Sequence, residues 1–348
     1  MLSHHIKKSR TAFTLIELLV VMAIISLLLG ILLPALNNAR AKAREAKDGT
    51  QVKQVHGGLV IASADNPSTG AYPLPSEINR IGTMVGRGIV DEFKNDHASL
   101  LAACIAKNLL SPALLVSPSE VSGKVAICSN YDMTKYDPAK DIFWDGDVTN
   151  PSSEKMSDPQ NFTTDLMLRC NTSYAFLPLG GKKPTAKTQS RRELQWKNSG
   201  DSRFPVVGNR GVKDGLETPE EYSVSRTLEI HGGRASWEGQ MAYNDNHVNF
   251  ERTFYPTGMT CVPKGKAVPP GDTACGAIAV VGVGLDNLFK RDDDGSQTAG
   301  NDTDAWLCVV NKVDCSGSNL PGSAGVTTTY KTGGGGGTTT TSGNVNYD

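Results

Sequence analysis

The sequence has no excess of charge of either sign. Its 35 Lys and Arg residues are balanced by 36 Asp and Glu residues, which gives a net charge of -1 and a pI near 6.6. Proteins that bind nucleic acids through phosphate groups need clustered Lys and Arg. The composition therefore predicts no nucleic-acid partner.

Closely spaced cysteine pairs are also lacking, although the chain has seven cysteines. Without a C-x-x-C pair, the spacing of a zinc ribbon or a thioredoxin-like redox motif is excluded. The closest pairs, Cys261 with Cys275 and Cys308 with Cys315, suit short disulfide loops formed outside the cytoplasm. Each bridge would stabilise the fold by roughly 2–4 kcal/mol. The alternative is buried thiols, and the odd count leaves one unpaired, which we expect to be Cys104 in an apolar helical pattern.

Catalytic motifs are lacking as well. No serine or cysteine lies in a recognisable nucleophile motif, and GVGLDN has only part of a dinucleotide fingerprint. His231, His247 and Asp245 are candidates for a metal or acid–base site, but histidines beside Gly-Gly more often hydrogen-bond the backbone. We therefore expect no enzyme and no required cofactor.

The N-terminus, in contrast, has a strong pattern. Residues 1–12 form a basic leader, whose positive charge should hold this end in the cytoplasm. Residues 18–33 are apolar apart from one serine and one glycine, and their neighbours extend the run to about twenty residues, enough to span a hydrocarbon core. The small residue Ala12 precedes the apolar run, so cleavage after the run, as in a secretory signal, is not expected.

A long helix is predicted to continue beyond the apolar run. Residues 37–62 are rich in Ala, Lys, Arg, Glu and Gln, which are strong helix formers. One helix over residues 13–62 would be about 75 Å long at 1.5 Å per residue. Pro34 should kink it or melt one turn. The apolar residues of its second half predict a buried stripe: Ala39, Ala43, Ala46, Val52, Val55 and Leu59.

Glu17 places a carboxylate near the start of the apolar run. A charge in the middle of a membrane helix costs roughly 2.5–3.5 kcal/mol on insertion scales, and less near the ends. The carboxylate therefore needs a partner, unless it reaches the headgroups by itself.

The segment T-A-F-T-L-I-E-L-L-V-V, with the basic leader before it and Pro34 after it, resembles the class III signal of type IV pilins and type II secretion pseudopilins. The resemblance covers residues 1 to 62. It implies that a prepilin peptidase cuts between Ala12 and Phe13 and methylates the Phe13 amine. Because the family usually has Gly before the cut, Ala12 predicts slower processing.

The same resemblance gives Glu17 a partner. After cleavage, the Glu17 carboxylate of one subunit can meet the Phe13 amine of its neighbour in a filament. Only one axial stagger satisfies both charges, so the pair would set the register of helices that otherwise slide. The segment 13–36 would first be a membrane anchor and later the filament core, with Pro34 as a second assembly residue.

An exported head is predicted over residues 63–324, where the composition changes to Pro, Gly, Ser and short apolar runs. Near-helical spacing predicts a helix over residues 91–110. Short strands are predicted over six segments: 124–130, 172–179, 204–209, 247–254, 277–285 and 305–310. A long N-terminal helix packed against a mainly antiparallel sheet makes the expected fold class α+β.

Residues 225–251 resemble a segment, R-H-G-G-x-A-N-x-x-F-x-D-G-H-V, that closes the head in a large group of prepilin-type proteins. We interpret them as a hairpin with strands over 231–237 and 241–251. Asn246 stands where that group has Gly, and a turn remains compatible because Asn tolerates left-handed geometry.

Five aspartates crowd one polar segment and predict a calcium site, because Ca²⁺ favours several carboxylate oxygens on a flexible loop: Asp292, Asp293, Asp294, Asp302 and Asp304. The major pseudopilins are similar in carrying a C-terminal calcium loop; a solvated acidic turn is the alternative. Residues 325–348 are rich in Gly and Thr and predict a flexible or surface-exposed tail.

Together these patterns predict a structural subunit of a pilus or pseudopilus, with the inner membrane as its first location and an extracellular or periplasmic filament as its second. The resemblance implies as partners copies of the chain, minor pilins, the prepilin peptidase and an inner-membrane assembly platform. The alternatives are a membrane-anchored monomeric binding or sensor protein and a bitopic hydrolase.

Overall fold

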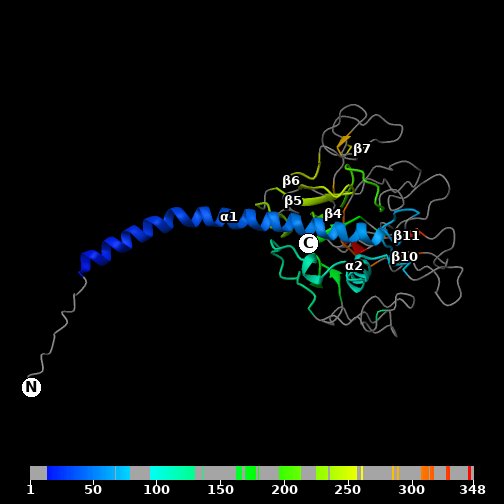
Figure 1. The fold of residues 1–348 in the computed structure, drawn as a ribbon, viewed down its shortest axis with the longest axis horizontal. Helices are drawn as coiled ribbons and strands as arrows, with labels where there is room; N and C mark the ends of the chain where they lie inside the picture. The colour runs from blue at the N-terminus through cyan, green and yellow to red at the C-terminus, as the bar shows by residue number, and fades with distance from the viewer. Residues whose placement is uncertain are drawn as a thin grey trace, which may run out of the picture. The chain divides into compact units, whose positions relative to one another are not determined.

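The computed structural model describes residues 14–66, 68–78, 95–129, 136, 162–166, 169–177, 179, 196–212, 225–233, 236–256, 260–261, 284–285, 288–289, 307–312, 314–316, 327–329 and 344–345. The chain divides into two compact units, Met1–Arg44 and Glu45–Asp348. Helix α1 (Leu15–Ser63) contributes residues to both units (Figure 1).

Helix α1 has 49 residues and a length of about 74 Å at 1.5 Å per residue. The helix continues without interruption through Pro34, so the locally melted turn expected there is absent. Pro34 lacks the backbone N–H that would bond the Gly30 carbonyl, and the surrounding turns remain helical despite that loss.

In the second unit, one face of α1 is buried. The prediction of a buried stripe is confirmed for Val52, Val55 and Leu59, whose side chains are fully buried. It is wrong for Ala39, Ala43 and Ala46, which are exposed. The buried face begins at Asp48 and includes polar residues that a search for apolar side chains passes over: Asp48, Gln51, His56 and Ser63.

Helix α2 (His97–Ala106) confirms the second predicted helix with narrower bounds. The Asp96 side chain caps its first turn by accepting a hydrogen bond from the Ser99 N–H at 2.7 Å. After the helix, Asn108 takes a left-handed backbone angle of φ 58°, and the 3-10 helix η2 (Pro112–Leu115) begins at a proline. Leu100 and Leu101 carry α2 into the hydrophobic core.

The second unit contains a four-stranded antiparallel sheet with strand order β3-β4-β5-β6, of which Figure 1 labels β4, β5 and β6. Its strands are β3 (Tyr174–Phe176), β4 (Pro205–Asn209), β5 (Gly239–Tyr243) and β6 (Val248–Glu251). Phe176 pairs with Val207, and Gly208 pairs with Met241. The sheet and the long helix confirm the α+β class.

The remaining strands of the described residues form four antiparallel pairs of two strands each. These are β1 (Thr164–Asp165) with β2 (Arg169–Cys170), β7 (Thr260–Cys261) with β8 (Gly284–Leu285), β9 (Val310–Lys312) with β12 (Asn344–Val345), and β10 (Asp314–Ser316) with β11 (Thr327–Thr329). Two segments of the Gly/Thr-rich tail, in β11 and β12, are therefore paired strands.

A hairpin forms within the predicted segment, but both predicted strands were misplaced, because the predicted second strand, 241–251, contains the end of β5, the turn and β6. The strands are β5 and β6, and the described residues 231–233 and 236–238 form turns and bends. A Cβ on Gly232 would lie 2.4 Å from the Ser236 carbonyl oxygen, so the backbone folds back on itself here and cannot run as a strand. Asn246 in the β5–β6 turn has φ 66°, as the left-handed interpretation predicted.

The 3-10 helix η5 (Thr227–Glu229) precedes this fold-back and adds the buried Leu228 to the core. Trp196 and Trp237 are also buried there; the Trp237 ring lies 5.1 Å from that of Phe289.

Candidate membrane and assembly segment

The first turn of α1 is closed by reciprocal hydrogen bonds between Thr14 and Glu17. The Thr14 N–H and hydroxyl both donate to Glu17 Oε2, at 2.8 and 2.7 Å, and the Glu17 N–H donates to the Thr14 hydroxyl oxygen at 3.3 Å. This is a capping box, a motif that the T-x-x-E spacing could have revealed but that the sequence analysis missed. Among the described residues, none donates a hydrogen bond to Glu17 Oε1.

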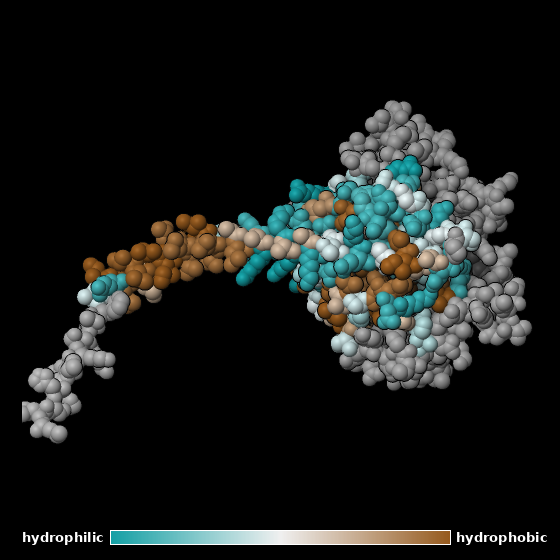
Figure 2. Space-filling view, in the orientation of Figure 1, coloured by the Kyte–Doolittle hydropathy of each residue, from teal (hydrophilic) through white to brown (hydrophobic). Residues whose placement is uncertain are grey.

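The helix that follows presents its apolar side chains outward. The large apolar side chains between Leu15 and Leu36 are 45–81% exposed, so they do not form a protein core. Figure 2 shows this stretch as a continuous apolar surface. By length and composition, α1 can cross a membrane, and it is the one helix of the described residues that meets both conditions.

Two of the predicted processing and assembly residues can be placed and two cannot. Glu17 is exposed in the first turn of α1, and Pro34 is exposed within the helix. Ala12 and Phe13 lie outside the described residues. Cleavage between them, and the pairing of Phe13 with Glu17, stay predictions.

In the second unit, Asp48 connects α1 to the head through two buried contacts. Its Oδ1 accepts a hydrogen bond from the Tyr174 hydroxyl at 2.8 Å, and its Oδ2 lies 2.7 Å from His231 Nε2. Burial, followed by the charge of Asp48, raises the pKa of Tyr174 well above its ordinary value. The Tyr174 hydroxyl therefore keeps its proton and remains a donor.

His56 makes a second polar connection from α1, to the turn between β5 and β6. Its Nδ1 lies 3.0 Å from Asn246 Oδ1, and its Nε2 lies 3.0 Å from the Tyr72 hydroxyl. That hydroxyl donates to Asn244 Oδ1 at 2.6 Å. Burial lowers the pKa of His56, although Asn246 and the nearby Asp245 act in the opposite direction.

The candidate metal or acid–base residues do not form one site. His231 contacts Asp48, whereas His247 contacts Asp245 and stacks on the Tyr243 ring, with centroids 4.4 Å apart. Within the described part of the chain, no group of three or more His, Cys, Asp or Glu residues could hold a metal ion.

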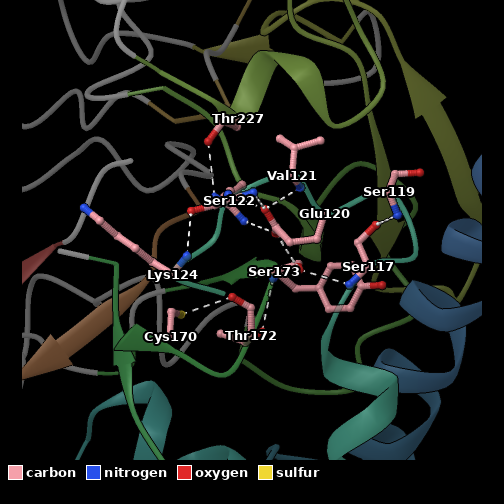
Figure 3. A network of polar contacts seen from close by, with 12 residues as sticks. Ser117, Ser119, Glu120, Val121, Ser122, Lys124, Cys170, Thr172, Ser173 and Thr227 are labelled. Atoms are coloured by element: carbon pink, nitrogen blue, oxygen red, sulfur yellow. Dashed lines mark hydrogen bonds and ion pairs between the residues drawn. The ribbon is translucent and has the colours of Figure 1, made fainter. Parts of the chain in front are cut away.

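A buried polar network of the head joins Glu120 to Arg210 and Ser173, and Figure 3 shows Glu120 and Ser173 within it. The Arg210 guanidinium donates to both Glu120 oxygens, at 2.5 and 2.9 Å, and the two side chains are only 2% and 5% exposed. The Ser173 hydroxyl donates to the same carboxylate at 2.7 Å. Burial raises the pKa of Glu120, but Arg210 and the hydrogen bonds outweigh burial and hold the pKa below its ordinary value.

These networks connect buried polar groups to one another. Asp48, His56, Glu120 and Arg210 each have named protein partners, an arrangement that stabilises a fold. No local sequence pattern marks these four residues, because their partners lie far away along the chain.

The described residues include only some of those in the cysteine and calcium predictions. Cys104 is a free, buried thiol, as expected, and burial raises its pKa to about 12. Cys308 is buried and exchanges backbone hydrogen bonds with Phe176 at 2.9 Å. The side chains of Cys261 and Cys315 and the whole of Cys275 lie outside the described part, so both disulfides stay predictions. The same holds for the calcium site at residues 292–304.

Residues 7–33 match the family model described as the prokaryotic N-terminal methylation motif. This motif is the prepilin-type signal of type IV pilins and pseudopilins. The match confirms the resemblance found in the sequence, and it includes Glu17 and most of the exposed apolar helix. No curated protein and no solved structure matches the chain.

The prepilin-type signal and the apolar helix together fit a pilin or pseudopilin subunit. The signal implies processing by a prepilin peptidase, and the helix indicates membrane anchoring before assembly. Both indicate a structural role for the chain.

Proposed function

We propose that this chain is a structural subunit of a type IV pilus-like or type II secretion pseudopilus filament. The observation that carries the proposal is a prepilin-type signal on a helix whose large apolar side chains, from Leu15 to Leu36, are exposed. The helix first anchors the chain in the inner membrane and then forms the filament core, outside the cell or in the periplasm. The head does the mechanical or adhesive work.

Apolar packing alone does not define how the subunits are staggered. Lipid tails are as apolar as leucine, so helices of this kind associate through close packing and a few polar contacts. Glu17 supplies such a contact, since an unpartnered charge within the bundle is costly. We expect it to pair with the Phe13 amine of the neighbouring subunit.

The capping box is compatible with that pairing. A carboxylate can accept about four hydrogen bonds, and both bonds from Thr14 go to Oε2. Oε1 is therefore available to an ammonium group from another subunit. Its own chain holds the carboxylate in place, and the neighbour supplies the opposite charge.

The partners follow from this role. The prepilin peptidase would remove residues 1–12 and methylate Phe13, and an inner-membrane assembly platform would move subunits into the filament. Copies of the chain and minor pilins would be its neighbours there.

Substitutions at Glu17 and Thr14 separate the charge from the helix cap. Glu17→Gln keeps a capping side chain but removes the charge, because Gln also serves in a capping box. Thr14→Ala weakens the cap by about 1 kcal/mol and keeps the charge. We expect Glu17→Gln, Glu17→Ala and Thr14→Ala all to be inserted and cleaved. Only the two Glu17 variants should be lost from filaments sheared from cells.

One result would contradict the register mechanism, and another would contradict the filament role. Normal incorporation of Glu17→Gln into filaments would show that the charge does not set the register. If the intact mass of membrane-extracted protein corresponds to a chain that starts at Met1, and not to one that starts at an N-methylated Phe13, an anchored monomer is favoured over a filament subunit.

A further inference from the structure

A basic collar follows the apolar segment of α1. Residues 18–39 carry no charged side chain, and the next five residues contain Arg40, Lys42 and Arg44, all of which are exposed. Arg40 and Arg44 are four positions apart, so they lie on the same face of the helix. Within the described part of the first unit the one acidic residue is Glu17, at the other end, and Glu45 follows Arg44 directly at the start of the second unit.

If the apolar segment spans the bilayer, the backbone of Arg40 lies in the headgroup layer, and Arg44 lies just beyond that layer, within reach of its long side chain. The 22 residues from Leu15 to Leu36 extend about 33 Å, close to the roughly 30 Å of a hydrocarbon core. Arg40 is then about 6 Å beyond the core and Arg44 about 12 Å beyond it. The headgroup layer is about 5–8 Å thick, and long basic side chains reach toward it.

We infer that this collar binds the phosphate groups of anionic phospholipids in the leaflet on the exported side. Guanidinium groups suit this partner, because their planar donor pattern matches phosphate oxygens bidentately. The collar stays with the chain, whereas the basic leader is lost on processing. The inference rests on the membrane-anchored state of the proposed function but not on filament assembly.

Anionic lipid would then hold the unassembled subunit at a fixed depth. The apolar surface alone permits sliding along the membrane normal. A collar bound to phosphate resists movement of the helix into the core, because two or three cations would enter hydrocarbon. Extraction into a filament would have to break these contacts.

The test uses the full chain reconstituted in phosphatidylcholine vesicles and in equal mixtures of phosphatidylcholine and phosphatidylglycerol. Flotation with the vesicles reports insertion. Electron paramagnetic resonance of spin-labelled phosphatidylglycerol, compared with spin-labelled phosphatidylcholine, reports which lipid the helix retains. We expect the wild-type chain to retain the anionic lipid preferentially, and the preference to weaken at high salt.

The decisive variants are Arg40→Gln and Arg44→Gln, each expected to lower the preference about fivefold. Lys53→Gln is the matched control: it removes the same charge from an exposed position of α1, about 14 Å beyond Arg44, and should leave the preference unchanged. The leader is identical in all of these proteins, so its lysines cannot produce the difference.

The outcomes distinguish this inference from the proposed function. A chain that floats but retains both lipids equally, or loses its preference to the same extent with Lys53→Gln, overturns the collar alone. A chain that does not float with either vesicle overturns the anchor and the collar together. If the arginine variants keep the lipid preference but fail to enter filaments, the collar pairs with acidic groups of a neighbouring subunit, and the lipid inference is wrong.

Discussion

His97 should make the head less stable as the pH falls from neutral to about 4. It is the first residue of α2, its side chain is fully buried, and Nε2 lies 3.1 Å from the Leu177 carbonyl oxygen. That carbonyl can only accept, so Nε2 carries a proton in the neutral ring. Burial lowers the pKa of His97 to about 4, although the bond to Leu177 favours the charged form.

Proton linkage gives the direction and the size of this change in the free energy of unfolding. Between pH 6.5 and 4 the unfolded chain binds a proton at His97 that the folded chain does not, so the free energy of unfolding decreases as the pH falls. At 1.36 kcal/mol per pKa unit, the full effect is about 3 kcal/mol, and most of it falls between about pH 7.5 and 4.5. Well above pH 6.5 neither state binds this proton, so His97 no longer makes the free energy of unfolding depend on pH.

Urea unfolding of the full chain in detergent, followed by tryptophan fluorescence, measures this loss, because Trp196 and Trp237 are buried in the head. The control is His97→Gln, which keeps a donor for Leu177 but does not titrate. Its free energy of unfolding should fall by about 2–3 kcal/mol less than that of the wild-type chain over the same window. Equal losses in both proteins would refute the reasoning.

Two further substitutions test the head. Arg210→Leu leaves the buried Glu120 carboxylate without its cation and should lower the free energy of unfolding by about 3–5 kcal/mol in urea titrations. Adding Glu120→Leu should recover part of the loss. An unchanged urea midpoint in the single variant would contradict the buried pair. Gly232→Ala forces a Cβ against the Ser236 carbonyl and should cost about 1–3 kcal/mol, whereas Gly233→Ala, where a Cβ has nothing within 4 Å, should change the melting temperature little. Equal melting temperatures for the two alanine variants would show that the fold-back is not tightly packed.

The sequence predicts well where a local pattern decides the structure. The N-terminal helix, the helix at α2 and the strand at β6 each have apolar periodicity or turn residues that suffice. Asn246 has the left-handed geometry that its residue type tolerates, although the strand predicted over 241–251 did not place the turn there.

The errors arise where distant residues decide. The sequence gives no sign that Asp48 is buried, because its partners, Tyr174 and His231, lie 126 and 183 positions away. The strand predicted at 231–237 fails for a related reason. Its glycines permit a close approach of the backbone to Ser236, and tertiary packing uses that approach for a turn.

The two units need different environments, and this difference supports the proposed role. Sixteen large apolar side chains between Leu15 and Leu36 are exposed, and fully burying each of them contributes about 1.5–3 kcal/mol, so a total of tens of kcal/mol favours lipid or other copies over water. The head, in contrast, has its own core and paired buried charges. An anchored monomer and a filament subunit satisfy the apolar helix equally well. Glu17 distinguishes the two states. A carboxylate held by the cap near the start of the apolar run destabilises a lone helix in a membrane, whereas among packed helices it can define one axial stagger.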